Sequence, residues 1–483
     1  MQDARPKFES ALIAATLAVI SAPALALDAA AVLQRVSAAM GADGLKSIRY
    51  TNEGTGYTFG QAYKPGMPWP KINIHSQVRT INYEAGAMRE EITLSRAEPK
   101  GGGGYPLVAQ QKNDQFVSGA YAWNQTAGGP AAGPRSISDR THQLWITPHG
   151  VLKAAARNNA TARRAGGLTA ISFSEPGRFR ATAYVNADNL VERVESRIPD
   201  PVLGETNAVT RYDGYRDHGG VKFPSRIRQT QGGHPVLDVT VREVLPNAPA
   251  DIQVPESVRA ATEKVTADKV ADGVWFIAGG SHNSVAIEMR DHLVLVEAPL
   301  NDGRTLPVLA QVKQLAPGKP IRYVINSHQH FDHSGGVRAA LADGATLITQ
   351  SGNKPYFASV FAVRNRIAPD QLAKSGRTPK FRTVNDKLVL SDGARTIELH
   401  RIKGSVHNDT FLMIYLPAEK LLIEADAYTP LPPNAPAPSP PNANNVNLVE
   451  NIERLGLAID KILPLHGRVV ALADLYAAVG RAP

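Results

Sequence analysis

The alternation of hydrophobic and polar residues indicates that the first half of the chain is mainly sheet. In residues 178–185 and 236–244 apolar side chains alternate with polar ones, which is typical of antiparallel strands with one face in water. Pro224 lies inside the strand predicted for residues 221–228 and indicates a strand at a sheet edge. We therefore predict an N-terminal domain of mainly antiparallel sheet over residues 28–250.

The pattern changes from about residue 264, where predicted helices alternate with predicted strands. A buried strand is expected at residues 321–325, and further strands at 273–277, 284–296, 345–349, 387–390, 396–402, 411–416 and 420–424. Helices are expected at 304–315, 335–342 and 445–460. Sheet with interspersed helices favours a layered α/β sandwich over residues 264–483.

Two segments without regular structure and one short helix complete the predicted organisation. Residues 28–40 predict the helix, and the proline-containing segment 246–256 is a natural linker between the two domains. Residues 430–441 hold seven prolines in PLPPNAPAPSPP and predict a long surface loop. We expect this loop and the N-terminal domain to shape the mouth of a pocket.

The composition is that of a soluble globular protein with more than one domain. The chain has 483 residues, of which 43% are hydrophobic and 20% charged. Its formal charge of +9 is spread along the chain, and no Lys/Arg run predicts a nucleic-acid partner. The absence of cysteine excludes disulfides, thiol nucleophiles and Cys-type zinc sites.

The N-terminus predicts export. Arg5 and Lys7 precede an uncharged run that ends in Ala24-Leu25-Ala26, which is typical of a secretory signal peptide spanning residues 1–26. The run is shorter than a membrane span, and no later segment predicts stable membrane insertion. We expect a periplasmic or secreted protein after cleavage near Ala26.

A histidine-rich motif directly follows the buried strand at 321–325. Three imidazoles and a carboxylate lie in the segment HQHFDH: His328, His330, Asp332 and His333. This ligand set suits zinc, and alternate residues of an extended segment point the same way, so the first two histidines can reach one ion. The alternative, a solvated loop, would leave four potential ligands idle beside a buried strand.

The motif resembles the His-x-His-x-Asp-His signature of the metallo-β-lactamase superfamily. Further motifs follow in that family's order: His407 in GSVHNDT, Asp426 in LLIEADAY and His466 in ILPLHG. The resemblance covers about residues 264–475. It implies an αββα sandwich, so the whole chain would be of mixed α+β and α/β class, with the antiparallel β domain first.

The resemblance implies a centre of two Zn²⁺ ions held by seven side chains. His328, His330 and His407 would bind one ion, Asp332, His333 and His466 the other, and Asp426 would bridge them. Such a pair lowers the pKa of a shared water and polarises the bond under attack. The implied reaction is hydrolysis of an ester-like, lactone or β-lactam bond in a small molecule by a bridging hydroxide.

Several assignments within this set have competitors. Glu424 lies two residues before Asp426 on the same predicted face and is a rival for its role, although the family register favours Asp426. A carboxylate at either position would be costly to bury without a hydrogen-bonding partner or a metal. Of the 13 histidines, the eight outside the motifs, His75 and His292 among them, are interpreted as surface or structural residues.

The sequence departs from the family pattern at Glu297, in Val-Glu-Ala-Pro, where the family often has Asp. This side chain could hydrogen-bond a ligand imidazole, or be a loop-end acid facing water. Tyr428 is a candidate for steadying an oxyanion, as a tyrosine does in lactone-cleaving relatives, with a packed aromatic as the alternative. We therefore treat Asp332 and Tyr428 as the catalytic candidates.

Two other functions remain open at this stage. One is a mononuclear iron oxygenase on the same scaffold, which would leave Asp332, His333 and His466 without a metal. The other is a periplasmic binding or carrier protein, since the successive predicted hairpins of residues 28–250 resemble the curved-sheet domains of periplasmic lipoprotein carriers. The metal content of the purified protein would distinguish the iron oxygenase from the zinc hydrolase. Alanine variants of His328 and His330 would distinguish the carrier protein, because they would abolish hydrolysis and leave ligand retention unchanged.

Overall fold

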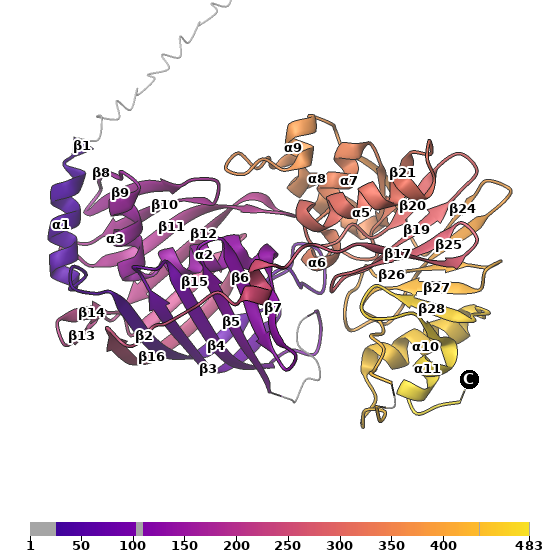
Figure 1. The fold of residues 1–483 in the computed structure, drawn as a ribbon, viewed down its shortest axis with the longest axis horizontal. Helices are drawn as coiled ribbons and strands as arrows, with labels where there is room; N and C mark the ends of the chain where they lie inside the picture. The colour runs from indigo at the N-terminus through magenta and orange to yellow at the C-terminus, as the bar shows by residue number, and fades with distance from the viewer. Residues whose placement is uncertain (1–25, 103–109, 434, 483) are drawn as a thin grey trace, which may run out of the picture.

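A computed structural model describes residues 26–102, 110–433 and 435–482 of the chain. These residues form two domains that lie side by side (Figure 1). Most of the predicted signal peptide, residues 1–25, lies outside the described residues.

The N-terminal domain is built on one large antiparallel sheet. Within the described residues it has fourteen strands, and β16 and β2 join its two halves. Across the sheet the strands are β1 (Ala26–Leu27), β8 (Thr161–Ala165), β9 (Leu168–Glu175), β10 (Phe179–Val185), β11 (Val191–Asp200), β12 (Gly204–Asp213), β15 (Arg226–Gln231), β16 (His234–Pro246), β2 (Ser47–Tyr57), β3 (Lys71–Asn82), β4 (Ala87–Arg96), β5 (Gln111–Ser118), β6 (Tyr121–Thr126) and β7 (Gly129–Ala132). The predicted antiparallel sheet domain is thus confirmed.

Three helices share a single hydrophobic core with this sheet. They are α1 (Ala29–Met40), α2 (Ile137–Trp145) and α3 (Pro148–Arg157). Helix α1 begins where Asp28 accepts hydrogen bonds from two backbone N–H groups, and it ends at Gly41, which has a φ of +67°. These caps explain why the helix predicted at residues 28–40 forms at that place.

The prediction for Pro224 was wrong. The expected strand is divided at this proline: β14 (Val221–Phe223) pairs only with β13 (Arg216–His218), and β15 begins at Arg226. Because the proline falls between the two strands, it interrupts no ladder, and β15 pairs on both sides, with β12 and β16.

The C-terminal domain contains two sheets packed face to face. The first has the order β17 (Thr266–Ala271), β18 (Val274–Ala278), β19 (Ser284–Glu288), β20 (Leu293–Val296), β21 (Ile321–Ile325), β22 (Thr346–Gln350) and β23 (Lys380–Val384). The second has the order β24 (Lys387–Ser391), β25 (Thr396–Arg401), β26 (Leu412–Leu416), β27 (Leu421–Glu424), β28 (Lys461–Pro464) and β29 (Val470–Ala471). A core of Val, Ile, Leu, Met and Phe side chains from both sheets fills the space between them.

Helices cover the outer faces of both sheets and complete an αββα sandwich (Figure 1). On the first sheet lie α5 (Asp302–Leu315), α7 (Val337–Asp343), α8 (Lys354–Ala362) and α9 (Gln371–Ser375). On the second lie α10 (Ala443–Leu455) and α11 (Leu472–Ala478). The short helices α4 (Glu256–Arg259) and α6 (Phe331–Ser334) belong to connecting segments. The predicted C-terminal fold is confirmed.

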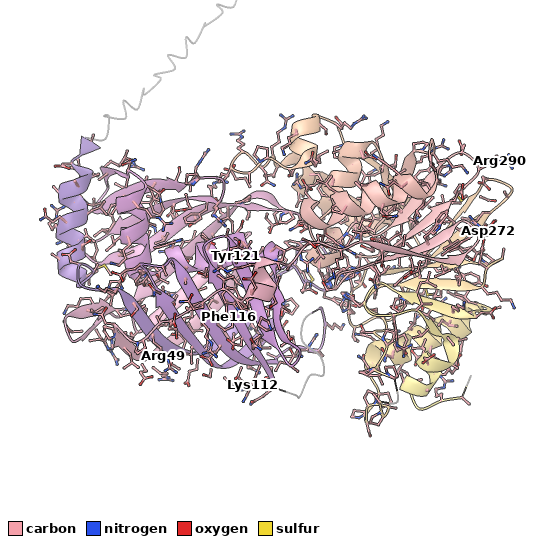
Figure 2. The ribbon with its side chains drawn as sticks, viewed as in Figure 1. Arg49, Lys112, Phe116, Tyr121, Asp272 and Arg290 are labelled. Carbon is pink, nitrogen blue, oxygen red and sulfur yellow. The ribbon has the colours of Figure 1, made fainter. Side chains whose placement is uncertain are left out.

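The outer edge of the C-terminal domain lies far from the N-terminal sheet. In Figure 2, Asp272 and Arg290 lie at that edge, whereas Phe116 and Tyr121 lie on the N-terminal sheet. Among the described residues, no helix is both long and apolar enough to cross a membrane.

Candidate metal centre

The proposed ligands all follow the ends of strands in the C-terminal domain. β27 and β28 run parallel with Glu424 opposite Pro464, so Asp426 and His466 both lie two residues beyond the paired ends. The HQHFDH motif follows β21, and His407 lies in the loop before β26. Because these strand ends meet at one edge of the sandwich, side chains from distant segments converge there.

One group of potential ligands consists of His328, His330, His407 and Asp426, whose ligand atoms all lie within 4.8 Å of one another. The Nε2 atoms of His328 and His407 are 3.2 Å apart. Asp426 Oδ2 lies 2.9 Å from His407 Nε2 and 3.7 Å from His328 Nε2. These are the three imidazoles predicted for the first ion, with the predicted bridging acid beside them.

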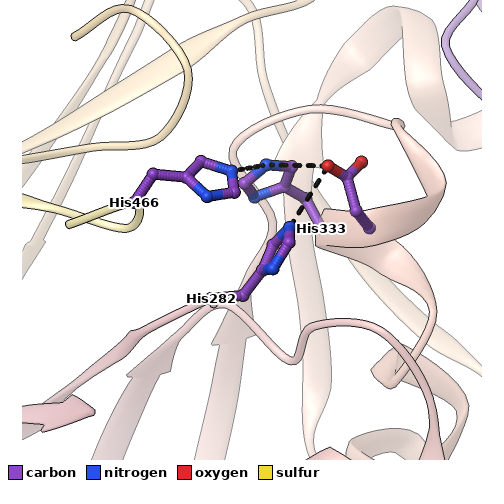
Figure 3. A group of neighbouring side chains, drawn as sticks. His282, His333 and His466 are labelled. Carbon is purple, nitrogen blue, oxygen red and sulfur yellow. Dashed lines mark hydrogen bonds and ion pairs between the residues drawn. The ribbon is translucent and has the colours of Figure 1, made fainter. Parts of the chain in front are cut away.

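A second group consists of His282, Asp332, His333 and His466. The rings of the three histidines come from separate segments and turn toward one another (Figure 3). The Nε2 atoms of His333 and His466 are 3.1 Å apart, and His282 Nε2 lies 3.2 Å from Asp332 Oδ2. This group contains the three residues predicted for the second ion and one more histidine.

Asp426 stands between the two groups. Its Oδ1 atom lies 2.8 Å from His333 Nε2 and 2.9 Å from His466 Nε2, while its Oδ2 atom faces His407 in the other group. One carboxylate therefore offers one oxygen to each group, as a bridging ligand must.

The protonation states at the centre suit metal ligands, which must offer a lone pair or a negative charge. Burial lowers the pKa of His328 and that of His330, the latter to about 3, so both rings are neutral. Burial alone would raise the pKa of Asp426, but the neighbouring His333 and His407 outweigh it and hold the pKa well below its usual range.

His333 differs from the other rings of the centre. Burial would lower its pKa, yet the charges of Asp426 and Asp332 raise it to about 10. The two carboxylates thus stabilise a positive charge at this position, which a proton or a metal cation can supply.

Hydrogen bonds outside the centre orient several rings. His330 donates from Nε2 to the carbonyl oxygen of Ala62 over 3.0 Å, which leaves its buried Nδ1 atom without a hydrogen-bond partner among the described residues. His466 donates from Nδ1 to the carbonyl oxygen of Ser281 over 3.1 Å and keeps the Nε2 lone pair for the centre. Oriented imidazoles with free lone pairs are typical of metal sites, so the residues present fit a metal pair.

The N-terminal domain contributes directly to both groups through the loop between β2 and β3. Ala62 contacts His330 of the first group, and its neighbour Gln61 donates a side-chain N–H to Asp332 Oδ1 of the second group over 2.8 Å. Gln329, inside the motif, also donates to the Ala62 carbonyl over 2.9 Å. Sequence reasoning missed these contacts because they join residues about 270 positions apart.

Close packing holds this loop on the motif. Gly60 accepts a hydrogen bond from the Phe331 backbone N–H over 3.2 Å, and a Cβ atom at Gly60 would lie 2.5 Å from the Phe331 ring. The rings of Phe59 and Trp69 meet the Phe331 ring edge-on, with centroids 5.3 and 5.5 Å away. The loop is therefore fitted to the face of the motif.

Glu297 is buried and does not face water. Its carboxylate accepts a hydrogen bond from the Ser327 backbone N–H over 2.6 Å, just before the motif begins. Its Oε2 atom is 3.8 Å from His333 Nδ1, which is too long for a hydrogen bond. Burial raises its pKa to about 7. Glu297 therefore supports the backbone before the motif, and its contact with the imidazole is electrostatic.

The structure does not bring Glu424 or Tyr428 into either ligand group. Glu424 is buried and accepts a hydrogen bond from the Tyr428 backbone N–H over 2.9 Å. Tyr428 is 2% exposed, and it lines a small cavity with Arg468, Asp474 and the proline-rich loop. Its expected role at an oxyanion has no geometric support, because its side chain is packed in the hydrophobic core.

His282 was missed because it lies outside the recognised motifs. The structure places this histidine, which was interpreted as surface or structural, in the second ligand group. It lies in the loop between β18 and β19, and its Nδ1 atom is 2.9 Å from Ser281 Oγ. One signal was present in the sequence: like the other ligands, this histidine closely follows the end of a predicted strand.

Part of the C-terminal domain matches a known protein family. Residues 277–464 match the family model described as the metallo-beta-lactamase superfamily. Solved structures similar to this chain include a metallo-beta-lactamase from Pontibacter korlensis (18% identity, 45% of this chain and 98% of that chain, TM-score 0.35). Another is the rubredoxin oxygen:oxidoreductase from Desulfovibrio gigas (17% identity, 44% of this chain and 61% of that chain, TM-score 0.35).

A curated relative is 26% identical over 164 residues, which are 34% of this chain and 46% of the relative. It is the alpha subunit of a 2,4-dinitroanisole O-demethylase from Nocardioides sp. strain JS1661. The match thus spans less than half of that protein's length. Together with the ligand geometry, the match of residues 277–464 identifies this domain as one with the fold and the metal-ligand motif of the metallo-beta-lactamase superfamily.

Proposed function

We propose that this protein is a metal-dependent hydrolase that holds two Zn²⁺ ions and cleaves an ester-like, lactone or β-lactam bond in a small molecule. The observation that carries the proposal is the position of Asp426, with one carboxylate oxygen toward each of two histidine groups. When bound, such a cation pair lowers the pKa of a shared water and polarises the substrate carbonyl.

The residues of the chain have separate tasks in this reaction. Asp426 would hold one ion with each of its oxygens, and the histidines of the two groups would provide ring-nitrogen ligands, His333 after it gives up its proton. Asp332 is held by Gln61 and lies next to His282, so its carboxylate is fixed in direction. The partial exposure of the Asp332 and His466 side chains, 28% and 22%, supports access for substrate from their side of the centre.

The experiment is a hydrolysis screen with and without a chelator, combined with metal analysis. The panel contains lactones, β-lactams, aryl esters and phosphodiesters, and also 2,4-dinitroanisole because of the relative's activity. We expect two zinc ions per chain and a chelator-sensitive rate on at least one carbonyl substrate. The double variant His328→Ala/His330→Ala should lose that rate and at least one metal.

Other outcomes would support the alternative functions. One iron per chain, with no hydrolysis, would contradict the proposal and favour an oxygenase. Retention of an apolar ligand by the double alanine variant, again with no hydrolysis by the parent protein, would favour a carrier. We further propose export: the mature protein purified from the periplasm should begin close to Leu27.

A further inference from the structure

A cavity of about 780 Å³ lies between the two domains, and both line it. Its N-terminal wall comes from helix α2 and strands of the large sheet, and its C-terminal wall includes Leu300, Phe331 and Asp332. The volume is that of a site for a medium-sized organic molecule, and such sites prefer domain interfaces. Because Asp332 belongs to a ligand group, a molecule in this cavity would lie against the metal centre.

His142 is a buried side chain in this wall, and within the described part of the chain its ring has no hydrogen-bond partner. It lies on α2, is 1% exposed and lines the cavity, yet neither ring nitrogen has a partner among the described residues. Burial lowers its pKa to about 3, so the ring is neutral and offers one donor and one acceptor. Buried polar groups are normally paired, so this ring indicates a missing hydrogen-bonding partner.

The buried cations of the same wall already have partners. Arg140 donates to the carbonyl oxygens of Phe116 and Trp123 over 2.9 and 2.7 Å and to Asn124 Oδ1 over 2.6 Å. Arg79 is paired with Glu90. These two guanidinium groups therefore need no anionic ligand. Among the described residues, the buried atoms of the lining that lack a partner are the two ring nitrogens of His142 and the Oδ1 atom of Asn365, all of them neutral groups.

Apolar side chains from both domains form much of the remaining lining. They include Met88, Ile198 and Leu237 of the N-terminal sheet and Leu300 and Phe331 of the C-terminal domain. A molecule that fills the cavity would remove this apolar surface from water, which favours an extended apolar or aryl body.

We propose that this cavity is the substrate chamber, and that it takes an uncharged ester or lactone with an extended apolar body that carries a hydroxyl or carbonyl group for His142. The proposal rests on the proposed hydrolase function and names the class of its substrate. It also gives the N-terminal domain the task of selecting the substrate.

The test compares three p-nitrophenyl esters: the acetate, the octanoate and the 8-hydroxyoctanoate. With the native protein, kcat/KM should rise at least about tenfold from acetate to octanoate, because the longer chain buries apolar surface, and it should rise again for the hydroxy ester. His142→Phe should lower the ratio of hydroxy ester to octanoate about tenfold, because it removes one hydrogen bond in a buried site.

Two further variants control the interpretation. His149→Phe changes another buried histidine, which is not among the residues that line the cavity and is hydrogen-bonded to the Met40 carbonyl over 3.1 Å. This variant should keep the native kcat/KM ratios of octanoate to acetate and of hydroxy ester to octanoate. Ala368→Trp places bulk in the cavity from a loop of the C-terminal domain and should lower the ratio of octanoate to acetate. This variant decides the question independently if His142→Phe is unstable.

Failure of the proposed hydrolase function and failure of the substrate chamber give different experimental results. No chelator-sensitive ester hydrolysis by the native protein would contradict the proposed function itself. Hydrolysis at equal kcat/KM for all three esters, unaffected by His142→Phe and Ala368→Trp while metal content stays normal, would overturn the chamber and leave the hydrolase intact.

Discussion

The single residue Asp426 contacts histidines of both ligand groups, and this predicts a direct consequence for metal binding. In Asp426→Asn one carboxylate oxygen becomes an NH₂ group, which cannot ligate a metal. This NH₂ group would face the ring nitrogens of one of the two ligand groups. We expect the variant to retain at most one metal per chain and to lose hydrolysis. Elemental analysis after gel filtration measures this.

Glu424 provides the matched control for that prediction. It is a buried carboxyl two residues away, and burial raises its pKa well above its usual range. Glu424→Gln therefore mimics the protonated side chain and should keep two metals. Loss of metal from the Glu424 variant, with retention in the Asp426 variant, would reverse the assignment of the bridging ligand.

Gln61 is expected to act on one ligand group only. Its amide donates to Asp332, so Gln61→Leu should weaken the group that contains His282 about tenfold, the lower end of the usual effect of removing a partner of a metal ligand. A competition titration of metal-free protein with Zn²⁺ and a coloured chelator resolves the two binding steps.

A change within the same loop controls for general disturbance of this segment. Tyr63→Phe removes a hydroxyl that donates to the Ser405 carbonyl over 3.0 Å and touches no ligand of either group. Tyr63→Phe should leave the Zn²⁺ affinities of both binding steps unchanged. Equal weakening of both steps by Gln61→Leu would contradict a role specific to Asp332.

At the scale of elements, the β2–β3 loop offers two glycines that can be compared. Gly60 and Gly66 have φ values of +80° and +75°, so alanine at either should cost about 1 kcal/mol in backbone strain. Only at Gly60 would the added Cβ meet the Phe331 ring, because nothing lies within 4 Å of the corresponding position at Gly66.

We therefore expect Gly60→Ala to displace the loop from the motif and to reduce both metal content and kcat/KM. Gly66→Ala should lower the unfolding midpoint by a similar small amount while it keeps both metals. Identical metal content in the two variants would show that the contact between loop and motif does not matter for the centre.

Elements defined by local pattern were predictable from the sequence. The strand Ile321–Ile325 forms at the predicted residues because its apolar run is bounded by polar and proline residues. The helix predicted at 445–460 was too long: α10 ends at Leu455 because Gly456 adopts a left-handed conformation and stops it. Boundaries therefore depended on single glycines and prolines more than on the hydrophobic pattern.

The candidate site was predictable only where its residues cluster in the sequence. The HQHFDH segment gave four candidate ligands together, and three later motifs added His407, Asp426 and His466 as candidates; the structure brings all seven side chains close together. No sequence motif marks His282 or Gln61, whose positions at the two groups arise only when separate segments meet in the folded molecule. For the same reason, Tyr428 was a plausible candidate in the sequence but lies in the core of the structure.

The stability of the whole molecule should fall in mild acid because of two buried histidines. Burial lowers the pKa of His142 to about 3 and that of His149 to about 4. Below pH 6.5 the unfolded chain binds protons at these rings that the folded protein does not bind, so stability is lost from pH 6.5 downward toward the folded pKa values. Each ring should cost about 2 kcal/mol between pH 6.5 and 5.

Urea unfolding at pH 7.5 and pH 5 measures this effect. His142→Phe cannot take up a proton, so its loss of stability between the two pH values should be about 2 kcal/mol smaller than that of the native protein. If the variant and the native protein lose the same amount, the ring of His142 is not the source of the acid sensitivity.

The spread of ligands along the chain sets the order in which the centre can be assembled during synthesis. His282 is made early in the C-terminal domain, whereas His466 becomes available only after β28 has been made and has paired with β27. A ribosome-bound chain that stops before β28 lacks His466, so its second ligand group is incomplete. If both groups bind metal, the full ligand set is present only after β28 has joined its sheet, and a fully loaded centre would report that this domain has folded.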